Sequence, residues 1–124
     1  MTAQSLARAA YGRPEAAIRT PRAIEYDLFA RVTHQLRAST TPGALFAALA
    51  QALHDNRLLW STLANDVLSD GNGLPSDLRA RLFYLSEFTQ THSRKVLAGQ
   101  ADAVALIEVN TAVMRGLRPE ETRR

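Results

Sequence analysis

The sequence contains no cysteine, and this absence removes several kinds of chemistry at once. Disulfide bonds, thiolate nucleophiles and cysteine-based zinc sites are excluded, and the composition is compatible with a reducing compartment. No apolar run approaches the roughly 18 residues that a membrane-spanning helix needs. No long apolar segment follows the first charges, as it would in a secretory signal. We therefore expect neither secretion nor a membrane partner.

Lysine is almost absent too, because Lys95 is the only one among 15 basic residues. The net charge of +3 is therefore carried by arginine, which can pair bidentately with carboxylates or phosphates. No block of five basic residues occurs. A solvated basic surface is the favoured interpretation, since positive charge alone is weak support for nucleic-acid binding.

Valine and isoleucine are scarce, whereas alanine, leucine and arginine dominate, and this balance favours helices. With 124 residues, of which 46% are apolar, the chain can bury a single core. A hydroxyl residue followed by proline, which is a helix-start signal, occurs at Thr20-Pro21 and at Thr41-Pro42. These signals predict a first helix over residues 21–38 and a second from 42 to about 68, each with an apolar stripe.

The stretch between Leu58 and Ala80 organises the chain, since it joins the two longest helical patterns. The turn over residues 69–74 contains Gly71 and Gly73, for which we predict positive φ. Leu74-Pro75 begins the third helix. Two helices joined so closely should pack antiparallel, and Trp60 should anchor both near their closed end.

The third helix should end at Gly99, acting as a left-handed cap, and Asp102 should cap or begin the last helix, which ends near Gly116. Asn56 interrupts the apolar stripe of the second helix. We expect it to bond a nearby backbone carbonyl or to lie at the edge of the stripe. Asp66 and Arg79 flank the turn and are predicted to form a structural pair.

The predicted fold is therefore all-α, a small bundle of about four main helices. Residues 1–19 form an N-terminal arm, in which the pattern allows a short helix and which should dock by Leu6 and Tyr11. Residues 20–117 form the helical domain, and residues 118–124 form a charged C-terminal tail.

No residue pattern supports catalysis or metal binding. The three histidines, His34, His54 and His92, lie on different predicted helices without a zinc-site spacing, so surface or boundary positions are favoured. The turn begins like a calcium loop but loses the pattern at Leu74. Nucleophile-elbow, phosphate-loop and dinucleotide motifs are missing. We expect no enzyme activity, no metal and no cofactor.

Apolar surface is the remaining functional feature. Phe46, Phe83, Tyr84 and Leu97 widen the apolar stripes beyond what a small bundle needs. Two interpretations stand: these side chains fill the core, or they line a groove that accepts an amphipathic partner helix.

The sequence resembles the FlaF family of flagellar biosynthesis regulators of certain flagellated bacteria. The resemblance covers roughly residues 6–117 and is weakest in the N-terminal arm and over residues 39–52. Its central residues are Leu59-Trp60, Leu63, Asp66, Asn72-Gly73-Leu74-Pro75, Leu78-Arg79-Ala80 and Leu85. The same pattern is fitted by Tyr11, Arg19-Thr20-Pro21-Arg22, Glu25, Phe29, Leu97-Ala98-Gly99, Leu106-Ile107-Glu108-Val109-Asn110 and Gly116-Leu117.

The resemblance implies a small cytoplasmic protein that is needed for flagellin production and filament assembly. It implies flagellin, through its terminal helical segments, as the partner of an export chaperone, and the regulator FlbT as a candidate second partner. The alternative is a regulator that binds flagellin mRNA, although no RNA-module pattern is found. A purely structural flagellar component is a third class, which the resemblance disfavours. The residues on which we place partner binding are Trp60, Leu63, Asp66, Asn72, Leu74, Pro75, Leu78, Arg79, Phe83 and Tyr84.

Overall fold

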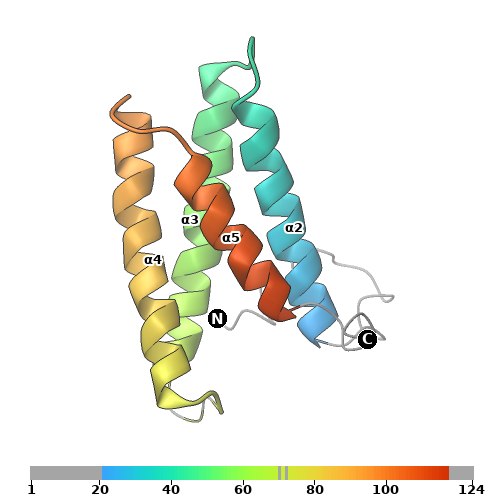
Figure 1. The fold of residues 1–124 in the computed structure, drawn as a ribbon, viewed down its shortest axis with the longest axis vertical. Helices are drawn as coiled ribbons and strands as arrows, with labels where there is room; N and C mark the ends of the chain where they lie inside the picture. Colours follow the sequence, from blue (N-terminus) through green and yellow to red (C-terminus); the bar gives the residue numbers. More distant parts are fainter. Residues whose placement is uncertain (1–20, 70, 72, 118–124) are drawn as a thin grey trace.

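The structure, a computed structural model, describes residues 21–69, 71 and 73–117. These residues form four helices and no strand: α2 (Pro21–Ser39), α3 (Phe46–Leu68), α4 (Ser76–Leu97) and α5 (Val104–Leu117). The helices run alternately up and down (Figure 1), which confirms the predicted all-α bundle. None of them is both long enough and apolar enough to cross a membrane. The predicted arm, Thr20 and the tail lie outside the described residues.

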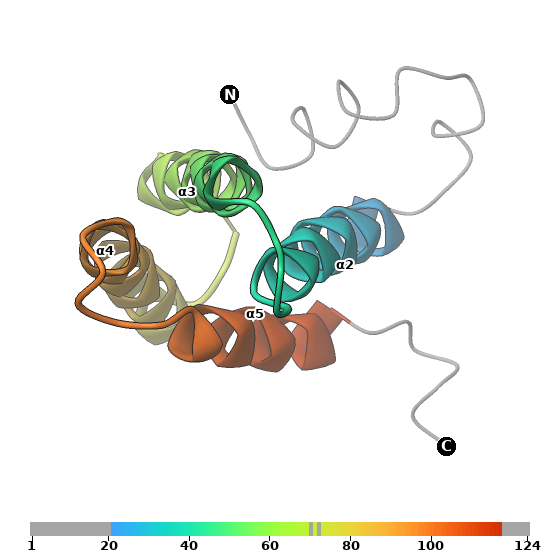
Figure 2. The same ribbon diagram turned by 90° about the horizontal axis from the view of Figure 1, so that it is seen from above.

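The four helices form a ring in the order α2, α3, α4, α5 when seen from above (Figure 2). Helix α3 packs along both α2 and α4, and α5 packs along α2. In contrast, α4 and α5 touch only sparsely. They meet at their connection and diverge toward the opposite end of the bundle (Figure 1). One edge of the ring is therefore less closed than the other three.

Two apolar clusters fill the interior, and each buried leucine-sized side chain contributes about 1.5–3 kcal/mol. The lower cluster consists of Leu28, Phe29, Val32, Leu59 and Trp60. The upper cluster consists of Leu36, Ala52, Leu53, Val96 and Leu106. The stripes predicted from residue spacing supply most of these side chains.

A buried polar bridge crosses the bundle from α3 to α5. The indole Nε1–H of Trp60 donates to Asn110 Oδ1 at 2.9 Å, and Asn110 Nδ2 donates to Asn56 Oδ1 at 2.8 Å. All three residues are fully buried. The prediction that Asn56 bonds a backbone carbonyl or lies at the edge of the stripe is therefore wrong. Asn56 is central, because a second asparagine on α5 provides its partner.

Trp60 anchors more helices than the α3–α4 pair that was predicted. Its ring packs edge-on against Phe29 of α2, with ring centroids 5.7 Å apart and an interplanar angle of 84°, and its N–H bonds α5. Trp60 also contacts α4, because Ser86 Oγ donates to its carbonyl oxygen and Leu85 packs against the apolar cluster to which it belongs. Trp60 therefore ties α2 and α5 to α3 in addition to its contacts with α4.

The predicted start of the second helix, residue 42, is four residues too early, since α3 begins at Phe46. Thr41 does not cap it. Its Oγ1 donates to the carbonyl oxygen of Ala38 at the end of α2, and Gly43 then adopts a φ of +86°. Chain reversal through a left-handed glycine outweighs the helix-start signal of Thr41-Pro42.

The other helix ends follow the prediction. Gly99 has a φ of +75°, and Gln100 N–H donates to the carbonyl oxygen of Lys95, as in a Schellman cap. Asp102 Oδ1 accepts from the backbone N–H of Val104. In the α3–α4 turn, Gly71 has positive φ but Gly73 does not, so only half of that prediction is confirmed.

Candidate partner-binding cleft

A largely apolar cleft of about 730 Å³ opens at the end of the bundle where α4 and α5 diverge. We call it the α4–α5 cleft. Its volume lies within the roughly 300–1,000 Å³ range typical of ligand-binding sites. The residues that line it are Glu25, Phe29, Leu63, Asp66, Gly73, Leu74, Leu78, Arg81, Leu82, Leu85, Ala112, Val113 and Gly116.

Helix α4 contributes a row of leucines, Leu78, Leu82 and Leu85, to one wall of the cleft. Their spacing of four and three residues puts them on one helix face. All three are half-buried. The adjacent face of α4 carries Ser86 and Gln90, which bond α3 through Trp60, Arg57 and Ser61. Helix α4 therefore docks on α3 through polar groups, and its leucines remain partly open to solvent.

The floor of the cleft is preorganised by the bundle core. Phe29 lines the cleft and is only 3% exposed, and its ring is held from within by the edge of Trp60. Leu63, one helical turn after Trp60, adds to the same surface, and Val113 contributes from α5. Because Trp60 also bonds Asn110, the bridge in the core fixes the relative positions of the floor and the α5 wall.

The charged groups of the cleft are two carboxylates, Glu25 and Asp66, and one guanidinium, Arg81. Glu25 and Asp66 are half-buried and come from α2 and α3, while Arg81 is exposed on α4. An apolar centre bordered by a few charges suits an amphipathic helix better than a small polar metabolite.

The structure brings four of the ten predicted partner-binding residues into this cleft: Leu63, Asp66, Leu74 and Leu78. Trp60 supports it from behind. Pro75 precedes α4 at the N-cap position. Asn72 lies outside the described residues.

The other predicted residues lie on different faces of α4. Phe83 and Tyr84 are exposed and do not line the cleft. Arg79 is half-buried, and its Nε has no hydrogen-bond partner in the described part of the chain. The predicted pairing of Asp66 with Arg79 stays a prediction.

Four apolar residues were considered as either core or groove residues, and the structure places all of them outside the core. Tyr84 is 68% exposed, Phe46 63%, and Phe83 and Leu97 37% each. The interpretation that they fill the core is therefore wrong. None of them lines the α4–α5 cleft, and their role in a groove for a partner helix stays a prediction. The cleft instead uses stripe residues that sequence reasoning assigned to the core.

Sequence reasoning therefore missed Phe29, Leu82, Leu85 and Val113 as cleft residues. The composition of α4 contained a usable signal. The buried residues of this helix are Ser86, Thr89, Ser93 and Val96, which are mostly polar. The leucines near the start of α4 are therefore not part of its buried face.

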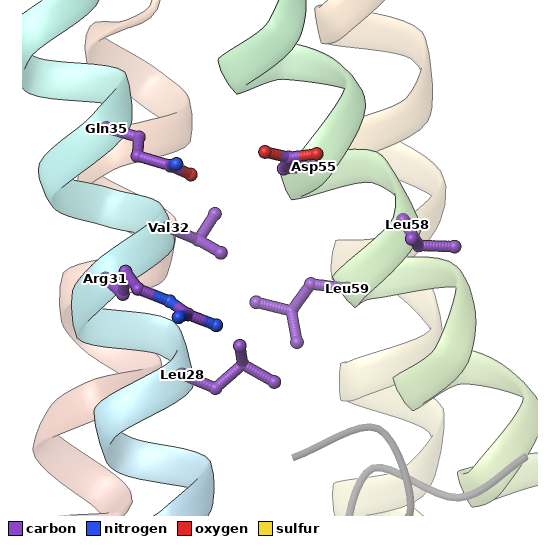
Figure 3. Close-up of a pocket in the computed structure, with 7 residues that line it drawn as sticks. All are labelled: Leu28, Arg31, Val32, Gln35, Asp55, Leu58 and Leu59. Atoms are coloured by element: carbon purple, nitrogen blue, oxygen red, sulfur yellow. The ribbon is translucent and has the colours of Figure 1, made fainter. Parts of the chain in front are cut away.

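A second, smaller cleft of about 320 Å³ lies between α2 and α3. Figure 3 shows Leu28 and Val32 of α2 and Leu59 of α3 pointing into the space between the helices, and Leu58 of α3 also belongs to the lining. Arg31, Gln35 and Asp55 add polar groups to this lining. This α2–α3 cleft offers less volume and less apolar surface to a partner helix than the α4–α5 cleft.

The histidines occupy the positions expected of surface or boundary residues. His34 and His54 are exposed, and His92 is half-buried, stacks on Phe88 and bonds the carbonyl oxygen of Asp102. Within the described residues no three potential metal ligands gather at one point. The absence of enzyme activity and of a cofactor stays a prediction.

Comparison with protein families gives one match. The family model described as flagellar protein FlaF matches residues 7–117, which confirms the resemblance seen in the sequence. Comparisons with curated proteins and with solved structures give no match.

Proposed function

Because the chain belongs to the FlaF family of flagellar proteins, we propose that it binds flagellin as an export chaperone and promotes flagellin synthesis, secretion and flagellum assembly. The observation that supports this proposal is the α4–α5 cleft, an apolar surface that the chain does not cover with its own described residues. The partner surface is the apolar face of flagellin's terminal helical segments. The cytoplasm is the proposed location, and FlbT the proposed second partner.

Such binding would cover apolar surface on flagellin before the filament assembles. A terminal segment whose apolar stripe packs against copies of itself in a filament would associate prematurely if left exposed. The α4–α5 cleft offers it the helix-in-groove mode of recognition, in which side chains at i, i+3, i+4 and i+7 fill a hydrophobic groove. The leucine row of α4 and the floor residue Phe29 are the contacts such a stripe would make.

The expected affinity is moderate. Completing the burial of a half-buried leucine gains roughly 1 kcal/mol, about half of the value for full burial. The apolar cleft residues together provide about 5–6 kcal/mol on this side of the interface. Ordering a segment that folds on binding costs about 2–5 kcal/mol. The partner's own apolar burial adds to the gain, whereas the loss of translational and rotational freedom on association subtracts from it. The binding is therefore expected to be reversible, which suits release at export.

The test compares purified protein mixed with flagellin and with flagellin that lacks its terminal segments. Binding to full-length flagellin alone supports the proposal, and equal binding to both removes the cleft mechanism. On the chaperone, Leu82→Asp places a charge in the apolar cleft and should weaken binding by about 2 kcal/mol or more, roughly thirtyfold. Tyr84→Asp, on an exposed face of the same helix, is the matched control and should bind like the unmodified protein.

The RNA-binding alternative makes a different prediction. A regulator that binds the flagellin leader RNA directly should shift it in a gel with a strong salt dependence. The proposed chaperone should show only weak, non-specific binding.

A further inference from the structure

We propose that the α3–α4 pair carries a second binding surface, separate from the α4–α5 cleft, which takes an acidic amphipathic helix of another protein. This surface follows the line where the two helices meet, on the side turned away from the bundle interior. We call it the outer α3–α4 face. Its residues are Phe46, Arg57, Leu68, Arg79, Phe83 and Leu97. The proposal does not depend on what fills the cleft.

The hydrogen bonds of Gln90 identify the flank of α4 that belongs to this face. Gln90 exchanges hydrogen bonds with Arg57 of α3, and α3 and α4 lie side by side in antiparallel directions (Figure 1, Figure 2). Residues seven or eleven positions apart share a helix flank, because they are separated by close to two or three whole turns. Phe83 and Leu97 stand seven residues before and after Gln90, and Arg79 stands eleven before it. All of them therefore lie along the α3 side of α4.

The matching flank of α3 carries exposed apolar side chains at both of its ends. Leu68 and Phe46 stand eleven residues after and before Arg57, and they are 62% and 63% exposed. Because the helices are antiparallel, Leu68 lies at the same end of the face as Phe83. At the opposite end Phe46 begins α3 and Leu97 ends α4. Exposed apolar groups gathered in this way are typical of interaction sites.

The charge of the outer α3–α4 face is positive. Arg57 and Arg79 lie on it, and the exposed Arg94 flanks it on α4. Glu87 is exposed near Arg94 and offsets one of these three charges, whereas both carboxylates of α3 line the two clefts. The Nε of Arg79 is buried and has no hydrogen-bond partner among the described residues. A carboxylate is the strongest acceptor for such a donor, so the face favours an acidic partner.

A helix is the occupant that fits the length and the pattern of this face. The 14 residues from Phe83 to Leu97 span about 21 Å at 1.5 Å per residue, which is about four turns of a partner helix. A second copy fits less well, because in a two-fold dimer the face meets itself and arginines oppose arginines. Single-stranded RNA needs a row of aromatic rings among the basic groups, and here the basic centre has none.

The first test uses a synthetic helical peptide of about 18 residues, with leucines along one side and glutamates beside them. Its control carries lysines in place of the glutamates. In methyl-resolved NMR of the full chain, the glutamate peptide should shift Leu68 and Leu97 and saturate at least tenfold more tightly than the lysine peptide. Leu82 reports any binding in the cleft separately. Shifts at Leu82 alone, or equal affinities of the two peptides at Leu68 and Leu97, would overturn the proposal.

Charge reversal tests the role of Arg79. Arg79→Glu should weaken the glutamate peptide at least fivefold and tighten the lysine peptide. Lys95→Glu makes the same charge change at an exposed position on another flank of α4, and it should alter the affinity less than twofold. Leu68→Asp, at a largely exposed position that should not disturb folding, should also weaken the glutamate peptide at least fivefold. Equal effects of the two charge reversals contradict the proposal.

Two further measurements separate the other occupants. Sedimentation of the unmodified chain should show no dimer that Leu68→Asp abolishes, and such a dimer would assign the face to a second copy. A single-stranded oligouridine should not displace the glutamate peptide from Leu68 and Leu97, and displacement would assign the face to RNA. Either result overturns the inference and leaves the proposed function of the α4–α5 cleft intact.

Discussion

Replacing Asn110 by leucine should destabilise the protein much more than replacing Asn56 by leucine, although both residues are fully buried and bonded to each other. Asn110 bridges two partners, so Asn110→Leu leaves the Nε1–H of Trp60 and the Oδ1 of Asn56 without partners inside the bundle. Each newly orphaned buried group costs about 1–3 kcal/mol, which gives a loss of about 2–6 kcal/mol. That is a large part of a typical stability of about 5–15 kcal/mol.

Asn56→Leu is expected to be nearly neutral. It orphans only Asn110 Nδ2, and it also removes the Nδ2 of Asn56, which has no hydrogen-bond partner among the described residues. The two effects oppose each other, so the free energy of unfolding should change by about 1 kcal/mol or less. Leucine keeps the branched shape of asparagine, so no large cavity is created at either position.

Urea unfolding measures the difference, followed by the fluorescence of Trp60, the only tryptophan, and by far-UV circular dichroism. With a denaturant dependence of about 1.5 kcal/mol per molar urea, a gap of 2 kcal/mol separates the two midpoints by about 1.3 M. Equal midpoints, or a lower midpoint for Asn56→Leu, would refute the reasoning that the bridge depends on Asn110.

Three further predictions concern single positions. Gly99→Ala should cost about 1–2 kcal/mol in urea unfolding because its φ of +75° is left-handed, whereas Gly73→Ala, with ordinary φ and open space around the added Cβ, should cost under about 0.5 kcal/mol. Gln90→Ala removes the side-chain hydrogen bonds to Arg57 and Ser61. The opening free energy of the α4 amides, measured by hydrogen exchange, should fall by about 1 kcal/mol, and unchanged exchange rates would contradict this. Leu82→Asp should lower unfolding free energy by only about 1 kcal/mol, since Leu82 is already half-exposed; a larger loss would make it unsuitable as a binding test.

Helix existence could be predicted from the sequence because it depends on local signals. Proline at residue 21, glycine at residue 99 and Asp102 act within one turn of their own position, and all three mark observed boundaries. The start of α3 could not be read in this way. Thr41-Pro42 carries the same signal as Thr20-Pro21, but the hydroxyl of Thr41 bonds backward to α2 and Gly43 reverses the chain.

The candidate site was only partly predictable because it depends on how two helices diverge. Leu63 and Leu78 were predicted to bind a partner and do line the cleft, yet the sequence does not show that α4 and α5 separate beside them. The sequence favours Phe83 and Tyr84 as binding residues to the same degree, but these two side chains lie on faces of α4 that do not line the cleft. Likewise, Asn110 stood in an apolar stripe like Asn56, but only the fold brings the two asparagines together.

The central claim is that the α4–α5 cleft receives the apolar face of a flagellin terminal helix. Methyl-resolved NMR of the full chain, titrated with a peptide of that segment, tests it most directly. The account predicts saturable shifts at Leu78, Leu82, Leu85 and Val113, with Leu58 unmoved. Shifts that cluster at Leu58 and the α2–α3 cleft, or no shifts at millimolar peptide, would contradict it.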